Sequence, residues 1–153
     1  MALYLVRHAK AGSRHDWTGP DEKRPLSKRG RRQAEGLVAQ LGYRGVERIV
    51  SSPSKRCVDT VRPLADTLGL EIETVPELDE GATRDQAMGL VHRLASTTAV
   101  VCSHGDVIGV ILEALADDGV DLPPERPCAK GATWELQVDA DRVVKAQYLP
   151  PPG

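Results

Sequence analysis

The chain has 153 residues, a formal net charge of −2 and an isoelectric point near 6.1. This length suits one domain, and the balanced charge excludes a global attraction to nucleic acid or to anionic membrane. The three cysteines are an odd number without CxxC spacing, which argues against a disulfide framework or a zinc ribbon and favours a reducing compartment. No apolar run approaches the roughly 18 residues of a membrane span, and the N-terminus lacks a signal-peptide pattern. We therefore expect a cytoplasmic single domain over 1–153, with a frayed tail at 150–153.

The first predicted strand covers residues 2–7, where a continuous apolar run leads into Arg7 and His8. Such a run is typical of a buried strand in a parallel sheet. In open α/β sheets ligands bind at the carboxyl ends of the strands, so Arg7 and His8 fall where such a fold keeps its chemistry. The polar segment 8–26 that follows is a long loop, and loops of this length are usually functional or disordered.

A helix is predicted after this loop, with Ser27 as its N-cap and Gly42 just past its end. Its first turn holds four cations within Lys28–Arg32, which oppose the helix dipole. Two interpretations stay open for this basic run: a solvated face, or an outer site for a polyanionic substrate.

The rest of the chain alternates strands with helices. The next strand is predicted over 47–51, followed by a helix that ends at Gly69 and has a kink or restart at Pro63. A strand over 71–75 leads into an acidic loop over 76–81 and then into a helix opened by a Thr83/Gln86 capping box. The last elements are a strand over 98–102, a helix over 107–116, a loop over 117–131, and a terminal antiparallel hairpin over 133–138 and 143–149. Cys57 and Cys102 fall on apolar faces and are interpreted as core packing. This pattern predicts an α/β fold, a three-layer α/β/α sandwich with a mostly parallel central sheet.

Several groups that can handle phosphate are predicted to meet at one edge of this sheet. His8 and His104 each follow a strand, Arg56 lies in the first turn after the second strand, and the third strand leads into the acidic loop. A guanidinium matches phosphate oxygens, a neutral imidazole can attack phosphorus, and a carboxylic acid can protonate a leaving oxygen. This combination points to phosphoryl transfer.

Four segments resemble known motifs, in the same order along the chain. Arg7–Ala9 is similar to R-H-G, Ser51–Thr60 to S-S-P-x-x-R-x-x-x-T, Leu78–Glu80 to L-x-E, and Ser103–Gly105 to S-H-G. Together they resemble the histidine phosphatase superfamily, which implies a phosphoglycerate-mutase-like fold. The short length and Arg24–Leu26 look like its SixA-like branch of phosphohistidine phosphatases. The chain also resembles the phosphatase-like half of two-domain MutT-type hydrolases, but contains no Nudix box.

The resemblance implies roles for individual residues. His8 would be the phosphorylated nucleophile, and Arg7, Arg56 and His104 would bind the transferring phosphoryl group. Glu80 is the candidate proton donor, in competition with its neighbours Glu77 and Asp79. Candidate substrate contacts are Lys10, Arg14 and Gly105. Ala9 departs from the motif, where a glycine is usual.

These roles lead us to expect a metal-independent phosphomonoesterase or phosphohistidine phosphatase that works through a phosphohistidine at His8. Two alternatives stay open: a nucleotide polyphosphate phosphatase with the same mechanism, and a non-catalytic phospho-ligand-binding partner of a Nudix protein. No metal-ligand spacing such as HxxxH or HExxH occurs, so we expect no metal and no cofactor. The expected partner is a phosphorylated protein, a small phosphorylated metabolite or a nucleotide, and neither a nucleic acid polymer nor a membrane.

Overall fold

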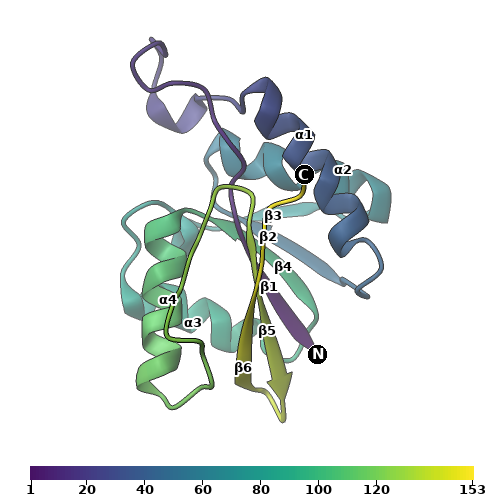
Figure 1. Cartoon of the computed structure of the whole chain (residues 1–153), viewed down its shortest axis with the longest axis vertical. Coiled ribbons are helices and arrows are strands. Elements are labelled where there is room, and N and C mark those ends of the chain that lie inside the picture. Colours follow the sequence, from purple (N-terminus) through teal and green to yellow (C-terminus); the bar gives the residue numbers. More distant parts are fainter.

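A six-stranded sheet runs through the middle of the computed structural model, which describes residues 1–153 (Figure 1). The strand order is β3-β2-β4-β1-β5-β6. The strands are β1 (Ala2–Arg7), β2 (Arg48–Ser51), β3 (Ile72–Thr74), β4 (Ala99–Ser103), β5 (Thr133–Asp139) and β6 (Arg142–Leu149). The first four strands pair in parallel, whereas β5 pairs antiparallel with both β1 and β6. The mostly parallel sheet and the terminal hairpin are therefore confirmed.

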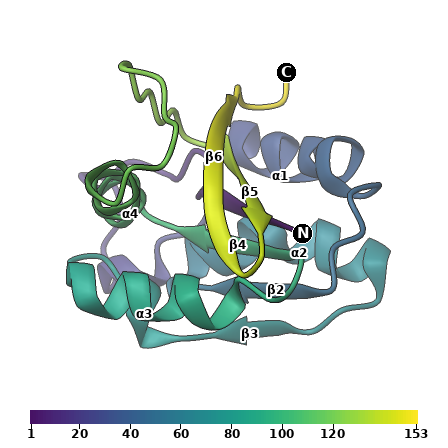
Figure 2. The ribbon, with the colours of Figure 1, turned by 90° about the horizontal axis from the view of Figure 1, so that it is seen from below.

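Two helices cover each face of this sheet, which makes the predicted three-layer sandwich (Figure 2). On one face lie α1 (Lys28–Leu41) and α2 (Lys55–Leu68), and on the other lie α3 (Arg84–Leu94) and α4 (Gly105–Asp117). Two short 3-10 helices, η1 (Asp21–Lys23) and η2 (Pro76–Leu78), lie in loops that reach the carboxyl edge of the parallel strands. None of the helices combines the length and the apolar content that a bilayer crossing requires.

Strand β1 supplies side chains to both apolar layers. Leu3 and Leu5 pack into the core beneath α3 and α4, whereas Tyr4 and Val6 pack into the core beneath α1 and α2. Successive side chains of a strand point to opposite faces, so a central strand covered on both sides must be apolar throughout. This is why the run before Arg7 is continuous and does not alternate.

The predicted helix boundaries follow from side-chain caps. The Ser27 hydroxyl accepts a hydrogen bond from the Gly30 amide at the start of α1, and both bonds of the Thr83/Gln86 capping box are present in α3. Gly69 ends α2 with a left-handed backbone, at φ 69°. The sequence signals for these ends are confirmed.

The predicted restart at Pro63 is wrong, because α2 runs without a break from Lys55 to Leu68. Proline has a backbone φ compatible with a helix and removes one hydrogen bond from it. The apolar face on either side of it, including Val61 and Leu64, is fully buried and keeps the helix in place.

The last four residues differ from the expected frayed tail, because they lie along α1. Gln40 Nε2 donates a hydrogen bond to the Pro150 carbonyl at 3.2 Å, and Pro152 packs over Gly36. A Cβ at position 36 would lie 2.5 Å from the Pro152 Cβ, so the glycine leaves the space that the proline fills.

Candidate active site

The carboxyl ends of β1 and β4 bring the two motif histidines together. Arg7 pairs with Ser103 across the two parallel strands, so His8 and His104 leave the sheet side by side. Their ring centroids are 5.5 Å apart, in an edge-to-face arrangement. The predicted meeting of these two residues at one edge of the sheet is confirmed.

Both rings line a cavity of about 670 Å³ at this edge. Its cationic side chains are Arg7, Lys10, Arg14, Arg24, Arg56 and Lys130, and its carboxylates are Glu80 and Asp106. Cations therefore outnumber carboxylates around the two imidazoles, although the whole chain carries a small net negative charge. The site suits a ligand with more than one negative charge.

His8 is neutral in this environment, and one of its ring nitrogens is hydrogen-bonded to the backbone. Burial lowers the pKa of His8 to about 3, because a charged imidazole would lose its hydration there and would face the charges of His104, Arg56 and Arg7. Nδ1 lies 2.8 Å from the Ala9 carbonyl. Since a carbonyl only accepts, Nδ1 carries the proton and Nε2 keeps its lone pair. A neutral imidazole with a free Nε2 is the nucleophilic form.

Hydrogen bonds tie this histidine to the second motif. The Ala9 amide donates to Thr60 Oγ1 at 2.9 Å, and the same hydroxyl donates to the Arg56 carbonyl at 2.6 Å. The His8 amide donates to the Ser103 carbonyl at 3.0 Å. These bonds fix the first turn of α2, and hence Arg56, relative to the end of β1.

The two motif arginines are each anchored by part of the guanidinium. Arg7 Nη1 donates to the Cys128 carbonyl at 2.6 Å. Arg56, which is 1% exposed, donates from Nη1 to the Asp21 carbonyl at 2.9 Å, and its Nη2 lies 3.2 Å from Asp21 Oδ2. In both side chains Nε is buried and has no hydrogen-bond partner in the protein.

His104 contributes a third unpartnered atom of this kind, its ring nitrogen Nδ1. The three nitrogens come from three different motifs and belong to residues that line one cavity. An unsatisfied buried polar group costs about 1–3 kcal/mol, so such groups are rarely left without a purpose. Because all three residues line the cavity, an oxyanion bound there would lie among their N–H groups.

The three acidic candidates in the 76–81 loop differ in where they lie. Glu77 pairs with Arg93 of α3 outside the cavity, and Asp79 accepts from Ser52 Oγ at 3.3 Å. Only Glu80 lines the cavity. Among the three, Glu80 is therefore the one placed to protonate a leaving group.

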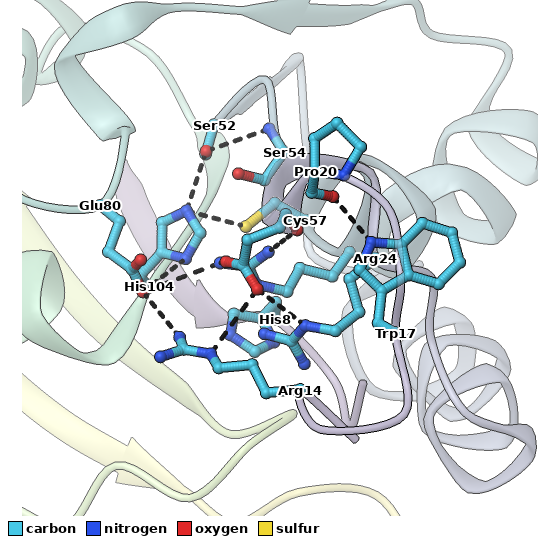
Figure 3. A network of polar contacts seen from close by, with 12 residues as sticks. His8, Arg14, Trp17, Pro20, Arg24, Ser52, Ser54, Cys57, Glu80 and His104 are labelled. Carbon is cyan, nitrogen blue, oxygen red and sulfur yellow. Dashed lines mark hydrogen bonds and ion pairs between the residues drawn. The ribbon is translucent and has the colours of Figure 1, made fainter. Parts of the chain in front are cut away.

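Cations surround the Glu80 carboxylate. Its Oε2 lies 3.7 Å from Arg14 Nη2 and 3.7 Å from Arg56 Nη2, and 4.0 Å from His104 Nδ1 (Figure 3). These separations place Glu80 beside Arg14, Arg56 and the second histidine.

The remaining predicted contacts divide into two groups. Lys10, Arg14 and Gly105 line the cavity, as the sequence predicts for substrate contacts. The exposed cations within Lys28–Arg32 do not line the cavity, and both interpretations of this basic run, a solvated face or an outer site, stay open. No three histidine, cysteine, aspartate or glutamate side chains gather closely enough to hold a metal ion.

Asp21 is a site residue that the sequence analysis missed. Its carboxylate contacts Arg24 at 3.0 Å, Arg56 at 3.2 Å and Arg14 at 3.6 Å. Burial opposes its ionisation, but the hydrogen bond from Arg24 and the charges of the three arginines outweigh burial and lower the pKa of the Asp21 carboxyl. The i,i+3 spacing of Asp21 and Arg24 was the one sequence signal for this cluster.

Lys130 is the second residue that was missed, since it lies in a long loop without a motif. Burial lowers the pKa of Lys130, and the charges of Arg7, Arg24, Lys10 and Arg14 lower it further. Burial is the larger cause of this shift, and the four neighbouring cations add to it.

The comparisons with known proteins agree with this geometry. A model of the histidine phosphatase superfamily (branch 1) matches residues 3–88. A relative from Mycolicibacterium smegmatis (strain ATCC 700084 / mc(2)155), an 8-oxo-(d)GTP phosphatase, is 37% identical over 155 residues, covering 98% of this chain and 48% of that protein. The chain thus spans about half the length of the curated relative that it matches.

Solved structures with the same fold include a protein histidine phosphatase and a putative phosphohistidine phosphatase. The protein histidine phosphatase SixA complexed with tungstate superposes with a TM-score of 0.78 at 20% identity, over 99% of this chain and 96% of that one. The putative phosphohistidine phosphatase SixA from Agrobacterium tumefaciens gives a TM-score of 0.70 at 26% identity, over 98% and 97%.

Proposed function

The chain belongs to the histidine phosphatase superfamily (branch 1), and from that premise we propose that it is a metal-independent phosphatase working through a phosphohistidine at His8. The observation that carries this proposal is the group of three buried, unpartnered nitrogens, Arg7 Nε, Arg56 Nε and His104 Nδ1, around the same cavity as a neutral nucleophile. Such an arrangement suits a phosphoryl group that must be bound and then transferred.

The reaction is a double displacement. Nε2 of His8 attacks phosphorus, and the bond between phosphorus and the leaving oxygen breaks as the Glu80 carboxylic acid donates its proton to that oxygen. A water molecule then attacks phosphorus and gives a proton to the Glu80 carboxylate, which releases inorganic phosphate and restores neutral His8. Charge on the phosphoryl oxygens is balanced throughout by the guanidinium groups of Arg7 and Arg56.

The nucleophile is tested by trapping the intermediate. We expect the protein to hydrolyse an aryl phosphate in excess EDTA, and brief mixing with labelled substrate to yield an acid-labile, base-stable phosphoprotein. His8→Asn should lose the label and reduce kcat by about 10⁴-fold or more. The matched control is His92→Asn, an exposed histidine on α3 that lies outside the cavity, which should behave as wild type. Loss of activity in EDTA, or a labelled His8→Asn protein, contradicts the mechanism.

A nucleoside polyphosphate is the second candidate substrate beside a phosphohistidine on a protein. The structural similarity to SixA supports a phosphohistidine on a protein as the substrate. The nucleotide is supported by the 37% identical relative and by Lys10 and Lys130, which add positive charge to the cavity beyond the motif arginines. The values of kcat/KM for a phosphohistidine peptide, a nucleoside triphosphate and an aryl phosphate separate the two classes. A preference for the nucleoside triphosphate that disappears in Lys10→Gln and Lys130→Gln would assign the substrate class as nucleotide. Tight binding of these substrates without formation of a phosphoenzyme would favour a non-catalytic binding module.

A further inference from the structure

The side of His104 that faces away from the cavity is held by a hydroxyl and a thiol. Its Nε2 lies 3.0 Å from Ser52 Oγ and 3.6 Å from Cys57 Sγ, while Nδ1 on the other side of the ring points toward Glu80 (Figure 3). Both neighbours of Nε2 are fully buried. Cys57 has no part in the reaction described above, and its sequence position alone indicated core packing.

The contacts of Ser52 indicate which way the hydrogen bond at Nε2 of His104 runs. Ser52 Oγ has a single proton, which it donates to Asp79 Oδ1 at 3.3 Å, and it also accepts from the Ser54 amide at 3.3 Å. All three contacts of Ser52 are satisfied together when it accepts from His104 at 3.0 Å. In this arrangement Nε2 of His104 carries a proton.

This assignment has a consequence for the cavity side of the ring. A neutral imidazole with its proton on Nε2 would present the Nδ1 lone pair to the phosphoryl oxygens, which repel it. Binding therefore needs a second proton on Nδ1, which makes His104 an imidazolium. Of the groups that face the ring, the guanidinium groups of Arg7 and Arg56 oppose this charge, and the His8 ring is neutral. Glu80 favours the charge from the cavity side once it has given its proton to the leaving oxygen and is a carboxylate.

We propose that Ser52 and Cys57 are positioning residues that fix Nε2 of His104 as a donor and hold the ring doubly protonated when a phosphoryl group is bound. The proposal rests on the proposed function. The pair of thiol and imidazole and the pair of thiolate and imidazolium contain the same number of protons. Because Nε2 already carries a proton and the second one is added at Nδ1, on the far side of the ring from Cys57, the thiol releases its proton to water and Nδ1 takes one from water in the cavity. Asp79 then anchors Ser52.

The surroundings of Cys57 favour its thiolate. Burial by itself would raise the pKa of this thiol, but hydrogen bonds with Cys102 and His104 and the charges of His104 and Arg56 outweigh burial and lower it to about 6. Burial raises the pKa of Cys102 well above its usual value, and the neighbouring Cys57 raises it further, so Cys102 stays a thiol that can donate to Cys57. A negative sulfur beside Nε2 supplies the counter-charge that the imidazolium needs.

The test compares the pH dependence of kcat/KM for an aryl phosphate in wild type, Cys57→Ala and Cys57→Ser. Without the thiolate the imidazolium loses its proton more easily, so the alkaline limb should move to lower pH by about one unit in both variants. At about pH 8 this gives a loss of about tenfold, with little loss at about pH 6. Serine is close to cysteine in size but does not ionise in this range, so it separates charge from packing.

Val61→Ala is the matched packing control, because Val61 is equally buried on the same face of α2, one turn beyond Cys57, and does not line the cavity. It should lose stability in chemical denaturation and keep the wild-type pH profile. A Cys57→Ala profile that superimposes on wild type would reduce Cys57 to core packing.

Nitrogen-15 spectra of the histidine rings, recorded with inorganic phosphate bound, test the same point without turnover. Both nitrogens of His104 should be protonated in wild type at about pH 7, and Nδ1 should lose its proton in Cys57→Ala. A wild-type ring with an unprotonated Nε2 overturns the assignment, even if the chain proves inactive. A chain without a phosphoenzyme but with the expected spectra would instead count against the proposed function alone.

Discussion

At the scale of single residues, small side chains beside the functional groups decide how those groups lie. Ala9 is fully buried, and its backbone carries hydrogen bonds both to the His8 ring and to Thr60. Gly105, at the start of α4, lies against the guanidinium of Arg7. The motif positions without a functional group, Ala9 and Gly105, therefore shape the space around the His8 ring and the Arg7 guanidinium.

Gly105→Ala should impair substrate binding without unfolding the chain. A Cβ there would lie 2.9 Å from Arg7 Cζ and 3.0 Å from Arg7 Nε. The guanidinium is the flexible end of its side chain, so it would move away and lose its contact with the phosphoryl group. A hydrogen bond to a charged group contributes about 1.5–3 kcal/mol, so KM for an aryl phosphate should rise by about tenfold or more.

The matched control for that change is Gly109→Ala, one helical turn further along α4. A Cβ there meets nothing within 4 Å. This variant should keep wild-type kinetics and gain about 0.5–1 kcal/mol in the free energy of unfolding, because alanine favours a helix over glycine. Equal KM values for the two variants would show that Gly105 does not set the position of Arg7.

At the scale of elements, the 8–26 segment is joined to α1 through one backbone carbonyl. Lys10 O accepts from the Ser27 amide at 2.9 Å and from the Ser27 hydroxyl at 3.0 Å, and it lies against Gly30 in the first turn of α1. The Lys10 amide donates to Gln33 Oε1, and Gln33 Nε2 donates to the Lys130 carbonyl. Helix α1 thus holds two loops that supply cations to the cavity.

Gly30→Ala should break this junction. A Cβ there would lie 1.9 Å from Lys10 O and 2.9 Å from the carbonyl carbon, and both belong to the backbone, so the helix and the loop must separate. We expect the free energy of unfolding to fall by about 1–3 kcal/mol in denaturant titrations. Gly89→Ala in α3 is the control, since its nearest neighbour is the flexible end of Arg93 at 3.6 Å. Equal free energies of unfolding for Gly30→Ala and Gly89→Ala would show that helix α1 and the loop at Lys10 can separate without loss of stability.

The elements also show how far the sequence alone could lead. Hydrophobic periodicity and caps located the strands and helices, and parallel strands share a carboxyl edge, so His8 and His104 had to approach each other. Contacts between loops had no such signal. Asp21 reaches Arg56 because the 8–26 segment folds back over α2, and Lys130 arrives because the Gly131 amide bonds to the carbonyls at the end of β1. These contacts depend on tertiary packing, which leaves no period in the sequence.

At the scale of the whole molecule, the site and the fold share one buried histidine. His8 is 6% exposed and neutral, at the end of the strand that separates the two cores. The sheet therefore holds the His8 imidazole at a buried position where its protonated, positively charged form is unfavourable. This links the stability of the fold to the protonation of the reactive group.

Acid should accordingly destabilise the protein through this residue. The pKa of His8 is about 3 in the folded chain and about 6.5 in an unfolded one, so the unfolded state binds more protons between these values. The contribution of His8 to stability is fully present above about pH 6.5 and falls as pH decreases, by up to about 3 kcal/mol at pH 4. His8→Asn, which does not titrate, should show a shallower loss in denaturant titrations across this range. An equal loss of unfolding free energy per pH unit in wild type and His8→Asn would contradict a low pKa for His8 in the folded chain.

The two tryptophans differ sharply in their surroundings, which gives the protein a built-in optical probe. Trp134 is fully enclosed and donates to the Pro127 carbonyl, whereas Trp17 is partly exposed in the 8–26 segment and donates to the Pro20 carbonyl, next to η1. Iodide in solution can therefore quench the emission of Trp17 and leave that of Trp134 intact. An anion that rearranges the segment on entering the cavity would change one fluorophore while the other serves as an internal standard.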